Sequence, residues 1–522
     1  MRLFLNASNP TRVMSQQFLR TAPLLGAIFF LIIIHSIGNL VPAFQAPDEP
    51  IHFSRTIEVS KRLTVLQRHA KAKSIEGLLY TDIDSFYEYI QQTDPLYNRA
   101  APPNRTETKS IMNSRIDELY SISYMPGFNL RHQMLGYTGI NYFPQSLAVE
   151  LGSLFNQTLS STYLIGRFFQ ELIASLVFGL SLFAFSRHQS WAGGLGIIIL
   201  TLPMTLHLIS SFSGDALVIE SSILLAIITD ILITTSIAKS ISSRDNGPQL
   251  SLTTIGLLLS YAVFISKASY IPIALALAVI SYAFLRAKFF VSHKKTSPLL
   301  LSILGGIALI TTVSVQWLRY TTPALRGLFE SRLDASIQLQ RKSELIQDPT
   351  QLISAIWATI SSKWADLARE TIGVLGSLNK PLPHIYWYQA CSAALVLFAL
   401  IPLVTKRRLT TQGTACNDLI IGSLIAVFTG LWMSCYLVFG AVWTTWSSAS
   451  SLTIEGLQGR HFLPLLSSMV IFTRLLSLSP FWPASTNTSA SRNLDFNIAS
   501  YILGVGICIN IAAYTATIRY WY

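Results

Sequence analysis

The most regular feature of the chain is a series of long apolar runs separated by polar segments. A hydrocarbon core about 30 Å thick needs about 20 mainly apolar residues per spanning helix, so such runs can be counted. They predict an all-α polytopic integral membrane protein with about eleven transmembrane helices, in which residues 1–522 form a single membrane domain. The predicted spans are 23–41, 162–186, 190–209, 215–236, 251–266, 268–285, 298–317, 385–404, 419–441, 461–478 and 498–518.

Two apolar runs need a separate interpretation. The run 23–41 could be a secretory signal, but no convincing small-x-small cleavage site follows it, and later spans favour an uncleaved anchor. The run 140–158 is too short and too polar for a full span. We expect it to form an interfacial or re-entrant helix.

The composition agrees with a membrane protein. The hydrophobic fraction is 51% and the charged fraction only 12%, about half the charge of an ordinary soluble domain. This composition argues against a soluble enzyme, and its apolar content excludes a disordered chain. A disulfide scaffold is excluded because all four cysteines lie in or beside apolar runs. The net charge of +12 would suggest nucleic acid as a partner in a polar protein, so the position of the basic residues decides its meaning.

The basic residues favour one orientation in the membrane. With the N-terminus in the cytoplasm, the cytoplasmic segments contain few acids and many cations, as short inner loops usually do. The charge therefore indicates topology, and no nucleic acid is expected as a partner. These cations are Arg2, Arg12, Arg20, Arg187, Lys239, Arg244, Arg286, Lys288, Lys294, Lys295, Lys406, Arg407, Arg408, Arg474 and Arg492.

This orientation leaves two long segments, 42–160 and 318–384, on the extracytoplasmic side. Neither has the long periodic pattern of an independent core, so both are expected to pack as short helices on the membrane surface. The second segment carries a mixed set of charges that we interpret mainly as solvated helix face. Its members are Arg326, Arg332, Asp334, Arg341, Lys342, Lys363, Trp364 and Arg369.

Two adjacent acids follow the first span, with a proline on each side of the pair. Prolines bias the preceding residue to an extended backbone and suit the start of a helix, so Asp48 and Glu49 should lie at an extended-to-helix junction. His52 and Arg55 would share the helix face that turns back toward Asp48. The acids either cap this helix or include a general base at the membrane surface.

Ionisable residues inside spans are costly and are functional candidates by default. The spacing of Arg167 and Glu171 predicts that they neutralise each other. Asp215 opens a span and could either start the helix or take part in chemistry, with Glu220 a little over one turn deeper. Asp230 lies toward the cytoplasmic end and is expected to be structural.

Two cations are placed where a lipid phosphate could reach them. Lys267 lies between two closely joined spans, and Arg460 follows Gly459 at the entrance of the tenth span, where backbone N–H groups also favour an anion. Snorkelling toward lipid headgroups is the alternative for both. The aromatic stretch 137–145, which includes Tyr142, could stack on a sugar or line a lipid entrance, although interfacial anchoring is the commoner role.

Together these blocks resemble the bacterial membrane-protein family catalogued as domain of unknown function 2142. Two departures affect acceptor or lipid specificity more than the fold: His461 stands where the family usually has Tyr, and the aromatic-proline block has fewer prolines. The matching blocks are Pro47–Phe53, Tyr142–Pro144, Gly166–Arg167, Pro203–Ala216, Ser266–Lys267 and Gln458–Pro464.

That family looks like the GT-C type of membrane glycosyltransferase, which implies a polyprenyl-phosphate-linked sugar donor, a glycan, lipid or cell-wall acceptor and an active site outside the bacterial inner membrane. The resemblance makes Asp48 the catalytic base, with Glu49 as the alternative. It makes Arg55, Lys267, Arg460 and His461 candidates for the donor phosphate, and His52, Tyr142 and Asp215 candidates for the substrate lining.

Other functions stay open at this point. A glycan polymerase or ligase would depend on arginines of the 318–384 segment, and a lipid-linked sugar flippase or other transporter would show paired halves and broken helices. No internal duplication is visible in the sequence. No cofactor is required, but Asp48, Glu49 and Asp215 could supply oxygen ligands to a divalent cation.

Overall fold

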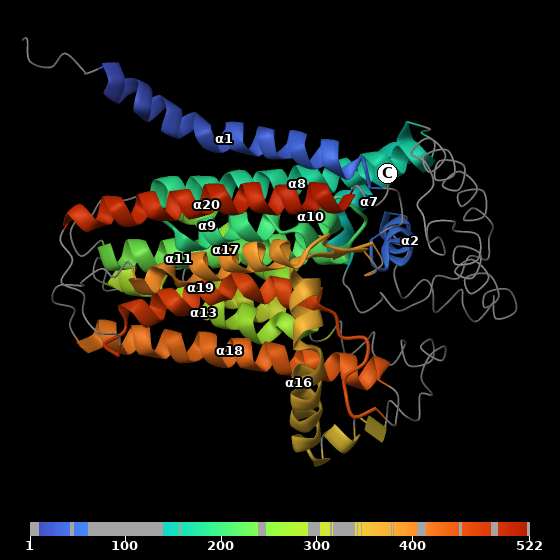
Figure 1. The fold of residues 1–522 in the computed structure, drawn as a ribbon. Coiled ribbons are helices and arrows are strands. Elements are labelled where there is room, and N and C mark those ends of the chain that lie inside the picture. The colour runs from blue at the N-terminus through green and yellow to red at the C-terminus, as the bar shows by residue number, and fades with distance from the viewer. Residues whose placement is uncertain are drawn as a thin grey trace, which may run out of the picture.

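The structure is a computed structural model in which long helices run side by side in one bundle (Figure 1). A few residues within the described ranges have a described backbone but no described side chain. The described residues are 10–41, 46–60, 139–155, 157, 159–238, 247–290, 303–313, 316, 340–341, 343–345, 347–376, 378, 380–404, 414–447, 451–481 and 489–518.

Eight helices in these ranges are long and apolar enough to cross a membrane, and each coincides with a predicted span. The all-α polytopic membrane architecture is therefore confirmed. The eight are Thr21–Gly38 in α1 (Pro10–Gly38), Ser161–His188 in α8 (Leu159–His188), Gly214–Ser236 in α11 (Gly214–Ala238), Ala268–Ala287 across η3 (Ala268–Tyr270) and α13 (Ile271–Phe290), α17 (Ile385–Val404), Asn417–Thr444 in α18 (Thr414–Trp446), Gly459–Leu478 across η4 (Gly459–Phe462) and α19 (Leu463–Leu478), and Phe496–Ile518 in α20 (Ser489–Ile518).

The predicted span 190–209 is a broken one. It consists of α9 (Trp191–Thr201) and α10 (Pro203–Ile209), which meet at a bend of 75°. Leu202 between them has an extended backbone, with φ −55° and ψ 139°. Pro203 explains the break, because proline cannot donate a backbone hydrogen bond and disfavours helical geometry in the residue before it.

Two other predicted spans are shorter where the structure describes them. The span 251–266 corresponds to α12 (Gly247–Phe264), whose apolar part is Thr253–Phe264, and the span 298–317 to the helix Ile303–Val313. Both are shorter than the roughly 20 residues that a full crossing needs. The count of eleven spans therefore stays a prediction.

The centre of the bundle is α11, which packs against α8, α9, α12, α13 and α19. Apolar or small side chains cover nearly the whole circumference of this helix, as expected for a helix surrounded by others. Its first turn lies at the end of the bundle that carries the candidate site described below. The position of α11 thus places Asp215 among several neighbouring segments.

The described elements of the two long predicted extracytoplasmic segments lie at that same end of the bundle (Figure 1). The first long segment contributes α2 (Glu49–Ser60), η2 (Gly139–Tyr142) and α7 (Phe143–Leu154), which confirms a helix within 140–158. The second contributes α16 (Thr350–Gly373) and a two-stranded antiparallel hairpin of β1 (Val374–Leu375) and β2 (Lys380–Pro381). At 24 residues, α16 is longer than the short helices expected here, and it crosses the direction of the spans.

Candidate functional site

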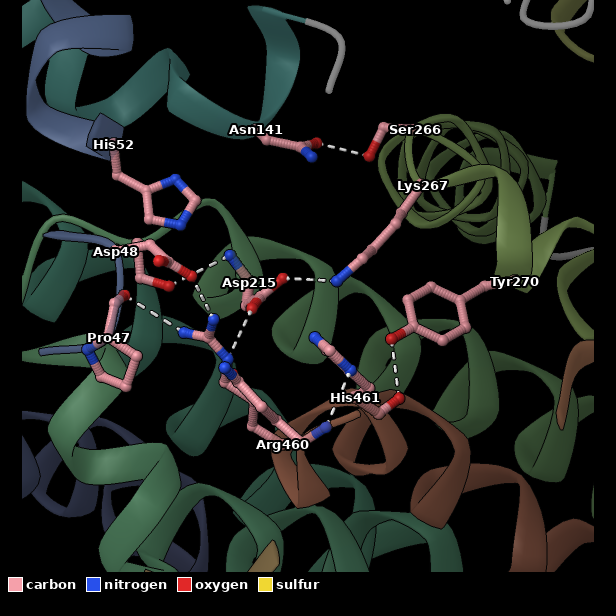
Figure 2. A network of polar contacts seen from close by, with 12 residues as sticks. Pro47, Asp48, His52, Asn141, Asp215, Ser266, Lys267, Tyr270, Arg460 and His461 are labelled. Atoms are coloured by element: carbon pink, nitrogen blue, oxygen red, sulfur yellow. Dashed lines mark hydrogen bonds and ion pairs between the residues drawn. The ribbon is translucent and has the colours of Figure 1, made fainter. Parts of the chain in front are cut away.

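Polar side chains from distant parts of the chain meet at this end of the bundle (Figure 2). They come from the turn before α2, from α2 itself, from η2, from the first turn of α11, from the turn before η3, and from η4. Sequence-predicted candidates from each of these segments are present. They are Asp48, His52, Tyr142, Asp215, Lys267, Arg460 and His461.

Arg460 ties the acidic turn to η4. Its Nη2 donates to Asp48 Oδ2 over 2.6 Å, and its Nη1 donates to the carbonyl of Pro47 over 3.1 Å. Asp48 has a φ of 59°, in the left-handed region that Asp tolerates better than most residues. The Asp48 side chain keeps 33% exposure while the guanidinium keeps 4%, so the carboxylate is the accessible member of this pair.

Asp215 links the two candidate cations. Its Oδ1 accepts a hydrogen bond from Lys267 Nζ over 2.9 Å, and its Oδ2 lies 3.8 Å from Arg460 Nε. Burial alone would lower the pKa of Lys267, but the Asp215 carboxylate acts in the opposite direction and the net pKa is raised. Lys267 is therefore charged at neutral pH, and two carboxylates face two cations.

His52 lies over this network as a neutral group. Its Nδ1 is 2.8 Å from the hydroxyl of Tyr142, and both side chains are buried. Burial lowers the pKa of His52 to about 4; Asp215 and Asp48 act against this shift, and Arg460 acts with it. The imidazole is therefore uncharged at physiological pH, and it shares a hydrogen bond with a phenol.

Tyr142 also explains a glycine in the block Pro203–Ala216, which contains Asp215. A Cβ on Gly214 would lie 3.0 Å from the Tyr142 hydroxyl oxygen, closer than ordinary van der Waals contact. The missing side chain lets η2 approach the first turn of α11. The interpretation of Asp215 as a helix-start residue holds as well, because Asp215 is in the first turn of that helix.

His461 closes the network on the side of η3 (Figure 2). Its carbonyl accepts a hydrogen bond from the hydroxyl of Tyr270 over 2.7 Å. Its imidazole Nδ1 accepts the backbone N–H of Gln458 at 3.5 Å, which stabilises the start of η4. His461 thus lies next to the cations and also supports the turn that carries Arg460.

Glu49 has a different environment from Asp48. It is fully buried; its Oε1 accepts hydrogen bonds from the Tyr163 hydroxyl and from the backbone N–H of Phe212 at 3.0 Å, and its Oε2 accepts the N–H of Ala46 at 3.1 Å. Arg167 Nε lies 3.9 Å from the carboxylate. Glu49 therefore fastens the start of α2 to α8 and to the turn before α11.

The expected pairing of Arg167 with Glu171 is wrong, and the expected position of Arg55 beside the acid stays a prediction. Arg167 and Glu171 are not within ion-pair distance of each other in the described residues: Arg167 instead donates to the carbonyl of Val41 over 3.0 Å, and Glu171 is 2.7 Å from His35. Both side chains have tertiary partners, which replace the expected pairing along the helix. The side chain of Arg55 lies outside the described residues, and the guanidinium that does meet the acid is that of Arg460.

Other polar groups lie deeper in the bundle. Gln170 donates to Glu220 over 2.8 Å, with both side chains buried. Asp230 accepts hydrogen bonds from the Ser190 hydroxyl at 2.7 Å and from the N–H of Ala192 at 3.1 Å, at the beginning of α9. The expected structural role of Asp230 is confirmed, because it completes a helix N-cap.

Sequence reasoning missed a link between η2 and the turn before η3. The Asn141 side chain is fully buried and is hydrogen-bonded to the Ser266 hydroxyl (Figure 2). A serine next to the singled-out Lys267, and an asparagine next to Tyr142, were the available signals. Small polar residues of this kind are too common in loops to be chosen from sequence alone.

The Gln-Gly-Arg block depends on a contact that the sequence did not indicate. Glu370 Oε2, near the end of α16, accepts the N–H of Gly459 at 2.7 Å, and the Thr371 hydroxyl donates to the Gly459 carbonyl over 3.0 Å. A Cβ on Gly459 would lie 2.1 Å from the carbonyl oxygen of Leu367. Gly459 is therefore required for η4 to lie against the backbone of α16.

The second long segment is only in part a solvated face. Arg341 is buried: its Nη1 donates to the carbonyl of Trp443 over 3.0 Å, and its guanidinium lies 5.0 Å from the centre of that ring. Arg369 is exposed and pairs with Asp366 at 3.5 Å. Trp364 is exposed and Lys363 is partly exposed, whereas four further members lie outside the described residues: Arg326, Arg332, Asp334 and Lys342.

The suggested metal ligands do not come together. Glu49 uses its oxygens on Tyr163, Phe212 and Ala46, whereas Asp48 and Asp215 face Arg460. Across the described ranges, no group of three His, Cys, Asp or Glu side chains is placed to hold a metal ion. The positive charge beside both aspartates comes from Lys267 and Arg460 instead.

Comparison with known proteins gives one match. A family profile described as "Predicted membrane protein (DUF2142)" matches residues 29–469, which include every residue of the network in Figure 2. Neither the curated proteins nor the solved structures contain a significant match.

Proposed function

The chain belongs to the DUF2142 family of predicted membrane proteins, and we propose that it is a membrane glycosyltransferase. It transfers a sugar from a polyprenyl-phosphate donor to an extracytoplasmic glycan, lipid or cell-wall acceptor. The observation that carries the proposal is an accessible carboxylate, Asp48, that is paired with Arg460 at one end of a bundle of membrane spans, where Asp215 connects Arg460 to a second cation, Lys267. A base for a hydroxyl and a binding site for a phosphate are thus adjacent.

The reaction follows from this arrangement. The acceptor hydroxyl loses its proton to Asp48 as its oxygen attacks the anomeric carbon of the donor sugar. The bond from that carbon to the phosphate oxygen breaks, and its electron pair stays on the phosphate oxygen. Lys267 and Arg460 stabilise the charge of the departing polyprenyl phosphate, as fixed cations do at developing negative charge.

The remaining candidates take supporting roles in this proposal. Glu49 positions the acidic turn, because its oxygens are engaged by protein donors and it is fully buried. Asp215 holds Lys267 toward Arg460, while neutral His52 with Tyr142 lines the sugar side, and His461 supports Arg460 beside the donor phosphate. Arg55 in α2 remains a candidate for binding the donor phosphate.

The proposed topology places this site outside the bacterial inner membrane, with the N-terminus in the cytoplasm. Tyr163 and Arg167, near the start of α8, contact Glu49, whereas Arg187 lies in the last turn of the same 30-residue helix. A helix of this length spans about 45 Å, more than the hydrocarbon core. The site and a member of the basic, cytoplasmic set therefore lie at opposite ends, which supports the orientation. Eleven spans and a GT-C-like architecture belong to the same proposal.

Sugar transfer can be tested in vesicles that contain the purified full chain. The probes are polyprenyl-phosphate hexoses and pentoses labelled in the sugar, with surface glycan extracted from a strain that lacks the protein as acceptor. We expect the label to move to one acceptor, and Asp48→Asn to reduce this transfer by about 10²-fold or more. The matched control is Asp366→Asn, an exposed carboxylate on α16 that should keep full activity. Full activity in Asp48→Asn would overturn the proposed base.

A flippase or transporter is the second candidate, and two observations favour it. Polar groups such as Gln170 and Glu220 pair deep in the bundle, and the 75° break between α9 and α10 resembles the discontinuous helices of transporters. Movement of lipid-linked sugar across sealed vesicles without any new covalent product would support this candidate. A glycan polymerase or ligase is less favoured, because the buried Arg341 is engaged with Trp443; growth of product chains by many sugars would support it.

A further inference from the structure

The helix α16 has an apolar face that the described residues leave uncovered. Ile353, Trp357, Ile360 and Trp364 are 51%, 73%, 39% and 65% exposed. Their spacing of three and four residues places them on one side of the helix, in a stripe of about three turns. We refer to these four side chains as the exposed stripe. Four large apolar side chains in one row make a surface that water covers only at a high free-energy cost.

The two other faces of α16 differ from the exposed stripe: one is buried and the other is polar. Leu352, Ala355, Thr359 and Leu367 are buried, and the Thr359 hydroxyl accepts the N–H of Ile454 over 2.8 Å, so this face holds the helix on the protein. The third face is exposed and polar. Its members include Gln351, Ser362 and Arg369.

The position of α16 is that of a helix lying across one end of the bundle. The helix packs against the spans α17 and α18, and Figure 1 shows it crossing their direction near the end of the bundle that carries the site. A helix in this position, with one apolar and one polar exposed face, has the geometry of an interfacial membrane helix. Tryptophan in particular favours the headgroup level, because its ring is apolar while its N–H group can reach water.

The end of α16 also reaches the site. Glu370 and Thr371 hold the backbone of Gly459 by two hydrogen bonds, and Gly459 precedes Arg460. We propose that α16 lies in the membrane interface with the exposed stripe in bilayer lipid. We further propose that this interfacial position of α16 holds Arg460 at the level of the lipid headgroups. The part of the proposal that concerns Arg460 rests on the proposed function, because a lipid phosphate would lie at the headgroup level. The interfacial position of α16 does not depend on the proposed function.

The depth of the exposed stripe in the bilayer can be measured by quenching of tryptophan fluorescence with brominated lipid. The full chain is placed in phosphatidylcholine bilayers brominated at either the 6,7 or the 11,12 acyl positions, and wild type is compared with the double variant Trp357→Phe/Trp364→Phe. We expect the emission lost in the double variant to be the part that 6,7-bromination quenches more strongly than 11,12-bromination.

Two single variants calibrate this measurement. Trp432→Phe, at an exposed position in the middle of α18, should remove emission that 11,12-bromination quenches more strongly. Trp443→Phe, at a buried position, should remove only unquenched emission and leave the amount of quenched emission unchanged. If the emission of Trp357 and Trp364 is insensitive to both lipids but is quenched by aqueous iodide, the stripe faces water and the proposed interfacial position is wrong. If this emission is insensitive to iodide as well, protein covers the stripe, and the proposed interfacial position is again wrong.

A second measurement addresses the link to Arg460. Trp357→Glu introduces a charge into the stripe, and Ser362→Glu introduces the same charge on the polar face. With equal melting temperatures in detergent, we expect Trp357→Glu to reduce sugar transfer in bilayers by about tenfold or more and Ser362→Glu to leave it unchanged. Equal activity of the two variants would overturn the link while leaving the quenching result intact. Absence of transfer in the wild type would instead contradict the proposed function alone.

Discussion

Arg460 and Asp48 lie 412 positions apart in the sequence, yet their side chains form a charged hydrogen bond of 2.6 Å. A second donor of the same guanidinium binds the carbonyl of Pro47. The arginine therefore sets the position of the acidic turn as well as its charge. Because Asp215 shares the guanidinium and also holds Lys267, the proposed base and the proposed phosphate site form one connected unit.

Replacing Arg460 by lysine separates these two effects. Lys keeps the positive charge but has no planar pair of donors for Asp48 and the Pro47 carbonyl. We expect the apparent affinity for the lipid donor to fall by roughly tenfold or more, in line with about 1.5–3 kcal/mol for a lost hydrogen bond to a charged group. The measurement is the dependence of initial transfer rate on donor concentration. An unchanged donor dependence would mean that charge alone is sufficient at this position.

Glu49→Gln should affect stability more than chemistry. The amide would present an N–H₂ group to donors that now bind carboxylate oxygens, and Arg167 would lose a nearby negative charge. We expect a loss of about 3 kcal/mol in the free energy of unfolding, because buried polar groups are left unsatisfied. Melting temperature and transfer rate are measured together. An unchanged melting temperature with complete loss of transfer would move the base from Asp48 to Glu49.

Gly459→Ala tests the contact between η4 and α16. The added methyl group would lie 2.1 Å from the Leu367 carbonyl oxygen and 2.4 Å from the Thr371 nitrogen, so the backbone must separate. We expect a loss of about 1–3 kcal/mol of stability, as for other overpacked positions, together with reduced transfer because Arg460 moves. Gly504→Ala in α20 is the control, since a Cβ there meets nothing within 4 Å. Equal behaviour of the two variants would contradict the proposed role of this contact.

The buried His52 predicts a loss of stability in acid. Its pKa is lowered to about 4 in the folded protein, whereas it is about 6.5 in the unfolded chain, so between these values the unfolded chain binds more protons. Stability therefore falls as the pH falls from about 6.5 toward 4, by up to about 1.4 kcal/mol per pH unit from this group. Melting temperatures of wild type and His52→Gln across pH 7.5 to 4.5 measure this contribution. Parallel curves for the two proteins would show that His52 does not bind its proton in this range on unfolding.

Chelation tests the charge balance of the site. Lys267 and Arg460 already place two positive charges next to Asp48 and Asp215, so the proposed reaction needs no divalent cation. We expect sugar transfer to persist in EDTA at the untreated rate. Loss of transfer in EDTA with recovery on addition of Mg²⁺ or Mn²⁺ would instead place a metal between the two aspartates.

The spans and the acidic turn could be predicted from the sequence because they depend on local patterns. Apolar runs such as 385–404 are long enough to identify a helix without knowledge of its neighbours, and the structure has a helix with the same bounds. The run 190–209 looked continuous because its apolar content is high throughout. Pro203 was the signal of the break, but proline also occurs inside unbroken helices here, as Pro402 does in α17.

The partners within the site could not be predicted, because they are tertiary contacts. The spacing from Asp48 to His52 brought the imidazole to the acid, but Arg460 comes from another part of the chain. Arg167 and Glu171 have a favourable spacing along one helix, and their real partners lie on other segments. The contact of Glu370 with Gly459 likewise depends on how α16 crosses the bundle, which no local pattern records.

The separation between Asp48 and Arg460 has a consequence for biosynthesis. A ribosome that adds 5–20 residues per second needs about 20 to 80 s to make the 412 residues between them. During this interval the acidic turn has left the ribosome, but the guanidinium that holds it does not yet exist. A chain that stops before η4 therefore carries the Asp48 carboxylate without the guanidinium that pairs with it in the complete protein.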